Sequence, residues 1–295
     1  MQHKEAITIE EQIAKMQERK IQIADIDKAK EILLDIGYYR LGHYFSPFEK
    51  GYPKLKIRTH NYIDGVKFSD AVRLYYFDFD LRIILLRYTS RIEIAFRTYL
   101  TYVLSIKYKS NNNWFVDENI VDKNFVDYFK STIYENIKKK PAIIKHHKKY
   151  KKVDFAPAWK TLEYLTLGEV LTLYKNLKST DDKLNICRHF GIKMTDVFEN
   201  YIETIRILRN DCAHGSPLFE LKLNKSVRKG PAYNDIPQNS QSLKAALDVI
   251  HYFINAISPN RAKDLKDEIA KIQNDIKSKN PQLVPILNKS TKMRF

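Results

Sequence analysis

The stretch from Ser69 to Lys109 constrains the fold of this chain more than any other part of the sequence. Its apolar residues recur at helical spacing and predict one long helix with a broad buried face. The run Asn111-Asn112-Asn113 follows and breaks the pattern. Glycine is scarce, at 8 of 295 residues, and proline modest, at 10, which argues against many tight β-turns. The predicted buried face consists of Val72, Tyr76, Leu81, Ile84, Leu85, Ile92, Ala95, Phe96 and Tyr99.

Helical spacing also recurs before and after this stretch, so the sequence predicts an all-α fold. Thr8 is suited to cap the first helix, and Gly37 to end the second. Residues 38–64 are aromatic and contain Pro47 and Pro53, which favours packed connecting structure. Further helices are predicted over residues 8–20, 26–36, 121–140, 159–176, 181–190, 195–214, 241–258 and 262–279, and a loop over 223–240.

The chain is predicted to divide into an N-terminal helical region with the aromatic connecting segment (1–68), a helical domain (69–258) and a charged helical tail (259–295). Its N-terminus is charged and unlike a signal peptide, and the most apolar stretch, Ile83 to Leu86, is far too short to span a bilayer. Two cysteines are too few for a disulfide framework. We therefore expect a soluble, cytoplasmic protein with no membrane partner.

The run Arg209-Asn210-Asp211-Cys212-Ala213-His214 places a cation, an amide and an imidazole at the end of a predicted amphipathic helix. At about 100° per residue, Arg206, Asn210 and His214 share one face and Arg209 lies on its flank. Gly215-Ser216-Pro217 then stops the helix. The opposite, apolar face consists of Val197, Phe198, Tyr201, Ile202, Ile205 and Leu208.

The Arg-x-x-x-x-His spacing alone is weak evidence for a site. An arginine and a histidine in a last helical turn also interact favourably with the helix dipole and with free carbonyl groups. Cys212 lies near the apolar face, so a small core residue is preferred over a thiol nucleophile.

Four blocks in order carry a resemblance to a known family: DIGYYRLGHYFSPFEK (35–50), FDFDLRIILLRYTSRIEIAFRTYL (77–100), PAWKTLEYLTLGEVLTLYKNL (157–177) and ILRNDCAHGSPLF (207–219). The last block resembles the signature of the HEPN ribonucleases. From about residue 8 to about residue 258, the chain is similar to the AbiD/AbiF (Abi-like) abortive-infection proteins of bacteria. Members of that family often continue the motif with a second histidine, where this chain has Gly215.

The resemblance implies a HEPN-like helical bundle and an antiphage toxin that acts as a metal-independent endoribonuclease on single-stranded RNA. Its products would carry 2′,3′-cyclic phosphate ends. His214 would move a proton at the ribose oxygens, Arg209 would hold the phosphate, and Asn210 would orient the imidazole or bond the phosphate. Arg206 would extend the grip on RNA. With one motif per chain, the resemblance implies a homodimer, and a bound non-coding RNA is considered as a regulator.

Positive charge is concentrated between Lys138 and Lys152 in a chain of formal charge +16. Such a run suits a polyanion, because each phosphate contact releases condensed counterions. Tyr150 is placed to stack on an unpaired base. The alternative is a solvated basic loop with no specific partner. The predicted RNA contacts are Lys145, Lys148, Lys149, Tyr150, Lys151 and Lys152.

Other candidate chemistry has structural interpretations. Asp78 and Asp80 are expected at a helix start, where carboxylates favour the dipole, and metal-binding catalysis is the alternative. Glu93 is expected to pair with Arg97 at i, i+4. Arg40 is expected in an aromatic core, with RNA contact as its alternative. No metal or cofactor is expected, since no Gly-rich phosphate loop occurs and the adjacent histidines 146 and 147 have no further ligand at metal spacing.

Three functions from different classes remain open. The chain is a toxic ribonuclease, a non-catalytic RNA-binding regulatory protein of a phage-defence or toxin–antitoxin system, or a helical protein that acts through protein partners. The first needs Arg209 and His214, the second needs mainly the lysines, and the third needs neither.

Overall fold

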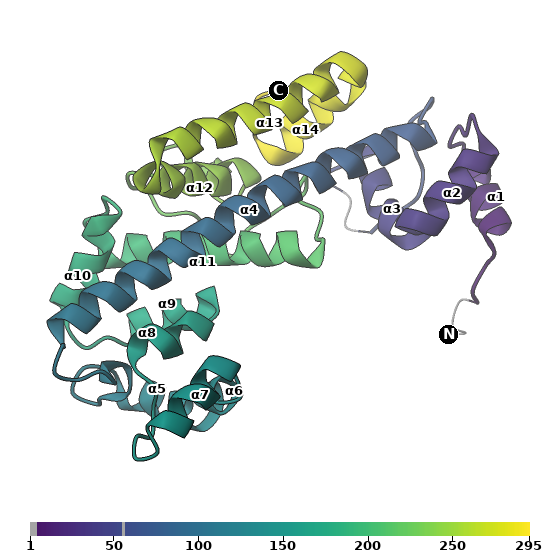
Figure 1. The fold of residues 1–295 in the computed structure, drawn as a ribbon. Helices are drawn as coiled ribbons and strands as arrows, with labels where there is room; N and C mark the ends of the chain where they lie inside the picture. Colours follow the sequence, from purple (N-terminus) through teal and green to yellow (C-terminus); the bar gives the residue numbers. More distant parts are fainter. Residues whose placement is uncertain (1–4, 55–56) are drawn as a thin grey trace. The chain divides into compact units, whose positions relative to one another are not determined.

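The computed structural model describes residues 5–54 and 57–295, and within these ranges the chain is helical with no β-strand, which confirms the predicted all-α fold (Figure 1). The long helix α4 (Phe68–Lys107) matches the predicted stretch closely. On its predicted face, Val72, Leu81, Leu85, Ile92 and Phe96 are buried. Tyr76 is 40% exposed, so its assignment to the core was wrong.

The chain divides into two compact units. Unit 1 comprises Met1–Ile83, Gly215–Leu221 and Glu268–Phe295, and unit 2 comprises Ile84–His214 and Lys222–Asp267. Helices α4 and α13 (Pro259–Lys279) supply residues to both. The division at residues 68 and 258 that the sequence suggests stays a prediction. No helix of the described ranges is both long and apolar enough to cross a membrane.

Unit 1 is built from short helices around the first part of α4. Thr8 and Glu11 form a reciprocal capping box that starts the first helix, as expected for Thr8. Gly37, with a φ of 87°, ends the second helix, and a further helix follows at once where connecting structure was predicted. The helices are α1 (Ile9–Glu18), α2 (Ile26–Ile36), α3 (Tyr38–Phe45), the 3₁₀ turns Ser46–Phe48 and Pro281–Leu283, and α14 (Val284–Thr291).

The buried carboxylate of Asp78 organises the polar interior of unit 1. It pairs with Arg82, accepts the Tyr44 hydroxyl at 3.0 Å, and accepts the backbone N–H groups of Leu218 (2.9 Å) and Phe219 (2.8 Å). Burial raises the pKa of Asp78 to about 6, while Arg82 and the N–H donors act in the opposite direction. Because α4 begins at Phe68, Asp78 is not at a helix start, and the dipole interpretation was wrong.

Unit 2 is packed around α11 (Thr195–His214), whose bounds equal the predicted range 195–214. All six residues of its predicted apolar face are buried. Helix α11 contacts α9, α10 and α12. The other elements are the 3₁₀ turns Trp114–Val116, Leu162–Tyr164 and Pro237–Asn239, the π-helical turn Phe129–Ile133, and helices α5 (Lys123–Tyr128), α6 (Tyr134–Ile137), α7 (Pro141–Lys149), α8 (Ala158–Thr161), α9 (Leu167–Lys175), α10 (Thr180–His189) and α12 (Leu243–Ile257).

Two predicted helices of unit 2 are divided in the structure. Residues 121–140 contain α5, a π-helical turn and α6, and residues 159–176 contain the end of α8, a 3₁₀ turn and α9. Helix α9 has its own start, because Thr166 and Glu169 form a capping box in front of it. The predicted loop over 223–240 is confirmed, apart from the turn at Pro237–Asn239.

Candidate ribonuclease site

The predicted motif lies in the last turns of α11. The side chains of Arg206 and Arg209 are 34% and 40% exposed, and His214 is exposed. Asn210 is partly exposed between them. Gly215, with a φ of 71°, follows the helix and ends it. The structure therefore presents all four predicted side chains to solvent on one helix end of unit 2.

Arg209 is held by a carboxylate of α4. Its Nε lies 3.7 Å from Oε2 of Glu93, whose other oxygen, Oε1, lies 3.7 Å from Nη1 of Arg97. Glu93 is 14% exposed, and Arg97 is anchored in turn by donating to the carbonyl of Leu165 at 2.7 Å. The predicted pair of Glu93 with Arg97 is confirmed. Its contact with Arg209 was missed, because no sequence pattern links α4 to α11.

Arg209 also approaches its neighbour in the motif. Its Nη1 donates to Oδ1 of Asn210 over 3.4 Å. The side-chain amide oxygen of Asn210 is thus directed to the guanidinium. Both this amide and the carboxylate of Glu93 therefore orient the guanidinium of Arg209. An arginine oriented in this way can present a defined set of N–H groups to a phosphate.

Arg206 is engaged within its own helix. Its Nε and Nη2 donate to the two carboxylate oxygens of Glu203 at 2.9 and 2.6 Å. The bonds from Arg206 hold the pKa of Glu203 below its usual value. Gly168 of α9 lies against the Arg206 stem, since a Cβ at this glycine would sit 3.3 Å from Cδ of Arg206. An RNA contact by Arg206 stays a prediction, and it would have to share the guanidinium with Glu203.

Gly215 follows directly after the motif. Arg40 of unit 1 donates from Nη1 to the Gly215 carbonyl at 2.9 Å. A Cβ at Gly215 would lie 2.9 Å from the same Nη1, and the positive φ disfavours any side chain there. A histidine at this position would be strained in its backbone and would require the end of the Arg40 side chain to move.

Part of the lysine run, Pro141–Lys149, forms helix α7, where the sequence predicted no helix. Lys145, Lys148 and Lys149 lie exposed on α7, and Tyr150, Lys151 and Lys152 follow its end. The helix was hidden in the sequence because only Ile143 and His146, one turn apart, point into the core between many lysines.

The structure does not bring α7 and the motif together. In Figure 1, α8 and α9 lie between α7 and α11 within unit 2. Helix α7 is held from its inner side, where His147 Nε2 bonds the Tyr134 hydroxyl at 2.8 Å. That hydroxyl also accepts the N–H of Ala156 at 2.8 Å. The lysines themselves are left exposed to solvent.

No three His, Cys, Asp or Glu side chains of the described residues are grouped so that they could hold a metal ion. Cys212 is buried, as expected for a core residue, and neither it nor Cys187 is in a disulfide.

The comparisons with known proteins give one match. The family profile for Abi-like proteins matches residues 31–220, which include α4, α7 and the motif at the end of α11. The chain therefore belongs to the Abi-like abortive-infection protein family. Neither the comparison with curated proteins nor that with solved structures gives a match.

Proposed function

We propose that this protein is a metal-independent endoribonuclease of antiphage defence. In this reaction the ribose 2′-oxygen forms a bond to the adjacent phosphorus and the bond from phosphorus to the 5′-oxygen breaks. A proton leaves the 2′-hydroxyl and a proton reaches the departing 5′-oxygen. The products are a 2′,3′-cyclic phosphate and a 5′-hydroxyl end.

One observation carries this proposal: an arginine oriented by Glu93 and Asn210 shares an exposed helix end with His214. The imidazole of His214 is suited to act as a general acid or base. The Arg209 guanidinium is permanently charged and suited to the non-bridging oxygens as negative charge builds on them. Asn210 fixes the arginine in the free protein, and Arg206 extends the basic surface toward RNA.

The assembly follows from the number of motifs. HEPN ribonucleases combine two motifs in one site, and this chain has one, so we propose a homodimer that places the two α11 ends on either side of a two-fold axis. The formal charge of +16 also suits a second, regulatory RNA bound to the protein.

A second function is supported by the lysines. Helix α7 offers a basic surface that lies apart from the motif, and a protein that only binds RNA would need no more than this. In this second proposal the protein is a non-catalytic RNA-binding regulator of a defence system, and the motif holds RNA without cutting it.

The two functions are separated by an assay of the purified protein with single-stranded RNA in excess EDTA. Cleavage with cyclic phosphate at the new 3′ ends is expected for the enzyme, and a DNA strand of the same sequence should stay intact because it lacks the 2′-hydroxyl. Strict dependence of cleavage on a divalent metal would contradict the proposed chemistry. RNA that is bound but stays whole in cells during phage infection would favour the regulator.

A further inference from the structure

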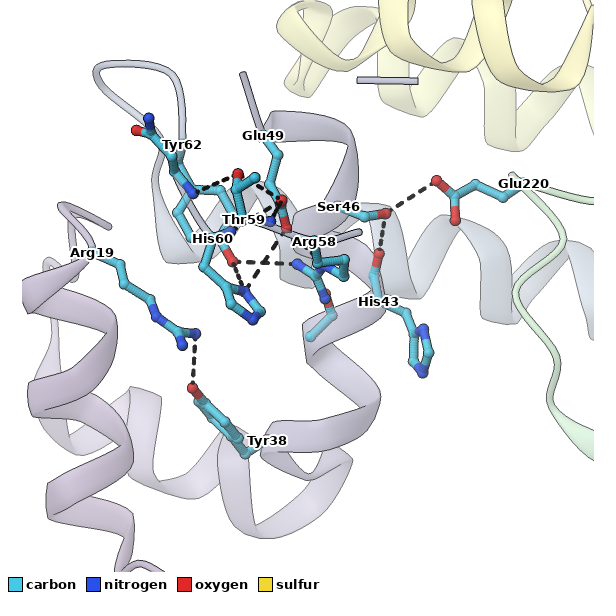
Figure 2. A network of polar contacts seen from close by, with 12 residues as sticks. Arg19, Tyr38, His43, Ser46, Glu49, Arg58, Thr59, His60, Tyr62 and Glu220 are labelled. Carbon is cyan, nitrogen blue, oxygen red and sulfur yellow. Dashed lines mark hydrogen bonds and ion pairs between the residues drawn. The ribbon is translucent and has the colours of Figure 1, made fainter. Parts of the chain in front are cut away.

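Unit 1 contains a pocket that the motif does not use. It has a volume of about 840 Å³ and lies between α1, α3 and the loop that carries Arg58 and His60 (Figure 2). Sites for small molecules commonly have volumes of about 300–1,000 Å³. All of its lining residues belong to unit 1, and none of them is a residue of the motif.

One wall of the pocket is fixed by a buried carboxylate. Glu49, whose side chain is 1% exposed, accepts Nε of Arg58 at 2.7 Å and the N–H groups of Thr59 (2.9 Å) and His60 (3.1 Å). Burial opposes the ionised form, but these bonds hold the pKa of Glu49 below its usual value. Arg58 also donates to the carbonyl of Gly42 at 2.7 Å, so its charge is already satisfied within the wall.

The opposite wall carries two cations without acidic partners. Lys15 of α1 and Arg19, the residue that caps the end of α1, lie four residues apart, and both line the pocket. Among the residues that the structure describes, neither forms an ion pair, and Arg19 bonds only the Tyr38 hydroxyl, over 3.3 Å. Of the residues that line the pocket, Glu5 alone is acidic, and it is exposed. This wall therefore keeps uncompensated positive charge.

An exposed aromatic ring stands at the entrance. Tyr39 of α3 lines the pocket and is 84% exposed. Its ring meets that of His43, one turn later, edge to face with the centroids 5.3 Å apart. The outer face of such a ring is available to stack on a planar group.

From these features we propose that the pocket binds a nucleoside monophosphate unit. Lys15 and Arg19 take the phosphate, and the base stacks on Tyr39 with His43 as its support. Guanidinium and ammonium groups together bind phosphate strongly, and bases of every kind stack on aromatic side chains. This ligand is either a free nucleotide or one nucleotide of a single-stranded RNA. The proposal does not depend on ribonuclease activity.

The test is equilibrium dialysis of the full chain carrying His214→Ala, so that added RNA is not cut. AMP should bind at least about tenfold more tightly than adenosine or inorganic phosphate, because each of these lacks one half of the recognised unit. The double variant Lys15→Gln/Arg19→Gln should bind AMP no better than adenosine, and Tyr39→Ala should weaken AMP by about tenfold. Lys50→Gln, an exposed lysine of unit 1 outside the pocket, is the matched control and should bind as the parent does.

The source of the nucleotide is settled by competition of AMP with two RNA pentamers, one with a 5′-phosphate and one with a 5′-hydroxyl. Displacement by both pentamers identifies an internal nucleotide of RNA, displacement by the phosphorylated one alone identifies an RNA end, and displacement by neither identifies a free nucleotide. The proposal is overturned if the parent and the folded double variant bind AMP equally well. It is also overturned if the parent binds no AMP and Tyr39→Ala does not weaken the binding of either pentamer. Loss of RNA cleavage in other variants would leave this result unaffected.

Discussion

The end of α11 and helix α7 are both basic surfaces of unit 2, but they hold their charges differently. Arg209 lies against Glu93 and Asn210, and Arg206 against Glu203, so both guanidinium groups have partners within the protein that favour one orientation. The exposed lysines of α7 and of the turn after it form no ion pair with the described residues. Charge that is oriented can define the geometry of a reaction, whereas charge that is free to move attracts a polyanion without defining geometry. Four changes test this distinction.

The largest effect is expected for His214→Ala. Removal of the imidazole should lower the rate of RNA cleavage by about 10²–10⁴-fold, the usual contribution of general acid–base catalysis. Phage protection and any toxicity on overexpression should be lost with it. The fold should be unchanged, since His214 is exposed, and circular dichroism checks this. A folded variant that still protects fully would show that α11 does not carry the active site.

Arg209→Ala should cost about 10²–10³-fold in cleavage rate, the effect of removing one donor to a developing negative charge. The measurement is single-turnover cleavage at saturating RNA, alongside phage protection. Arg209→Lys should recover only a small part of the loss, because an ammonium group cannot replace a forked guanidinium. Full recovery by lysine would mean that only charge is needed at this position, as on α7.

Glu93→Gln should slow single-turnover cleavage by about tenfold, because a misplaced catalytic group can cost up to 10²-fold and the guanidinium keeps its bond to Asn210. RNA affinity should stay the same, which separates orientation from binding. Glu163→Gln is the matched control, since Glu163 pairs with Arg97 but has no ion pair with Arg209. Equal rates for the two variants would show that Glu93 does not position the arginine.

The smallest effect on chemistry is expected for α7. Replacing Lys148, Lys149, Lys151 and Lys152 by Gln should weaken binding to all RNA sequences by a similar factor. It should flatten the log–log salt dependence by up to about one unit for each phosphate group that the variant no longer binds. Single-turnover cleavage at saturating RNA should be unchanged, because binding that is equal in ground and transition states does not alter that step.

The control is a second quadruple variant that has the same net charge as the α7 variant. Lys193, Lys222, Lys229 and Lys263 are exposed lysines of unit 2 outside α7, and their replacement by Gln should leave the affinity largely as it was. If the two quadruple variants bind RNA equally well, α7 is a solvated surface and the RNA path lies elsewhere.

The sequence predicted those structural features that depend on contacts within a single helix. The apolar face of α11 could be recognised because six large residues repeat at helical spacing, and the Glu93–Arg97 pair because it lies within one helix. Helix α7 was missed because its buried stripe has only Ile143 and His146. The contact of Glu93 with Arg209 depends on how α4 packs on α11, and no pattern within either segment encodes it.

The same distinction holds in unit 1. Thr8 and Gly37 were recognised as helix boundaries because capping chemistry is local. Asp78 was assigned to a helix start because, apart from Arg82 at i+4, its partners could not be seen in the sequence. Two of these partners, the N–H groups of Leu218 and Phe219, come from a distant segment of the chain. Their hydrogen bonds compensate for the burial of the carboxylate in the core.

The hydrogen bonds to Asp78 also determine the rate of hydrogen–deuterium exchange at two backbone amides. An amide that donates to a buried acceptor exchanges with solvent only when the surrounding structure opens. The amides of Leu218 and Phe219 both donate to a carboxylate with no exposed surface, although they lie in a short segment outside any helix. Their exchange is therefore tied to the opening of unit 1. The segment that follows the motif begins only a few residues beyond His214. The exchange rates of its two amides therefore measure the stability of unit 1.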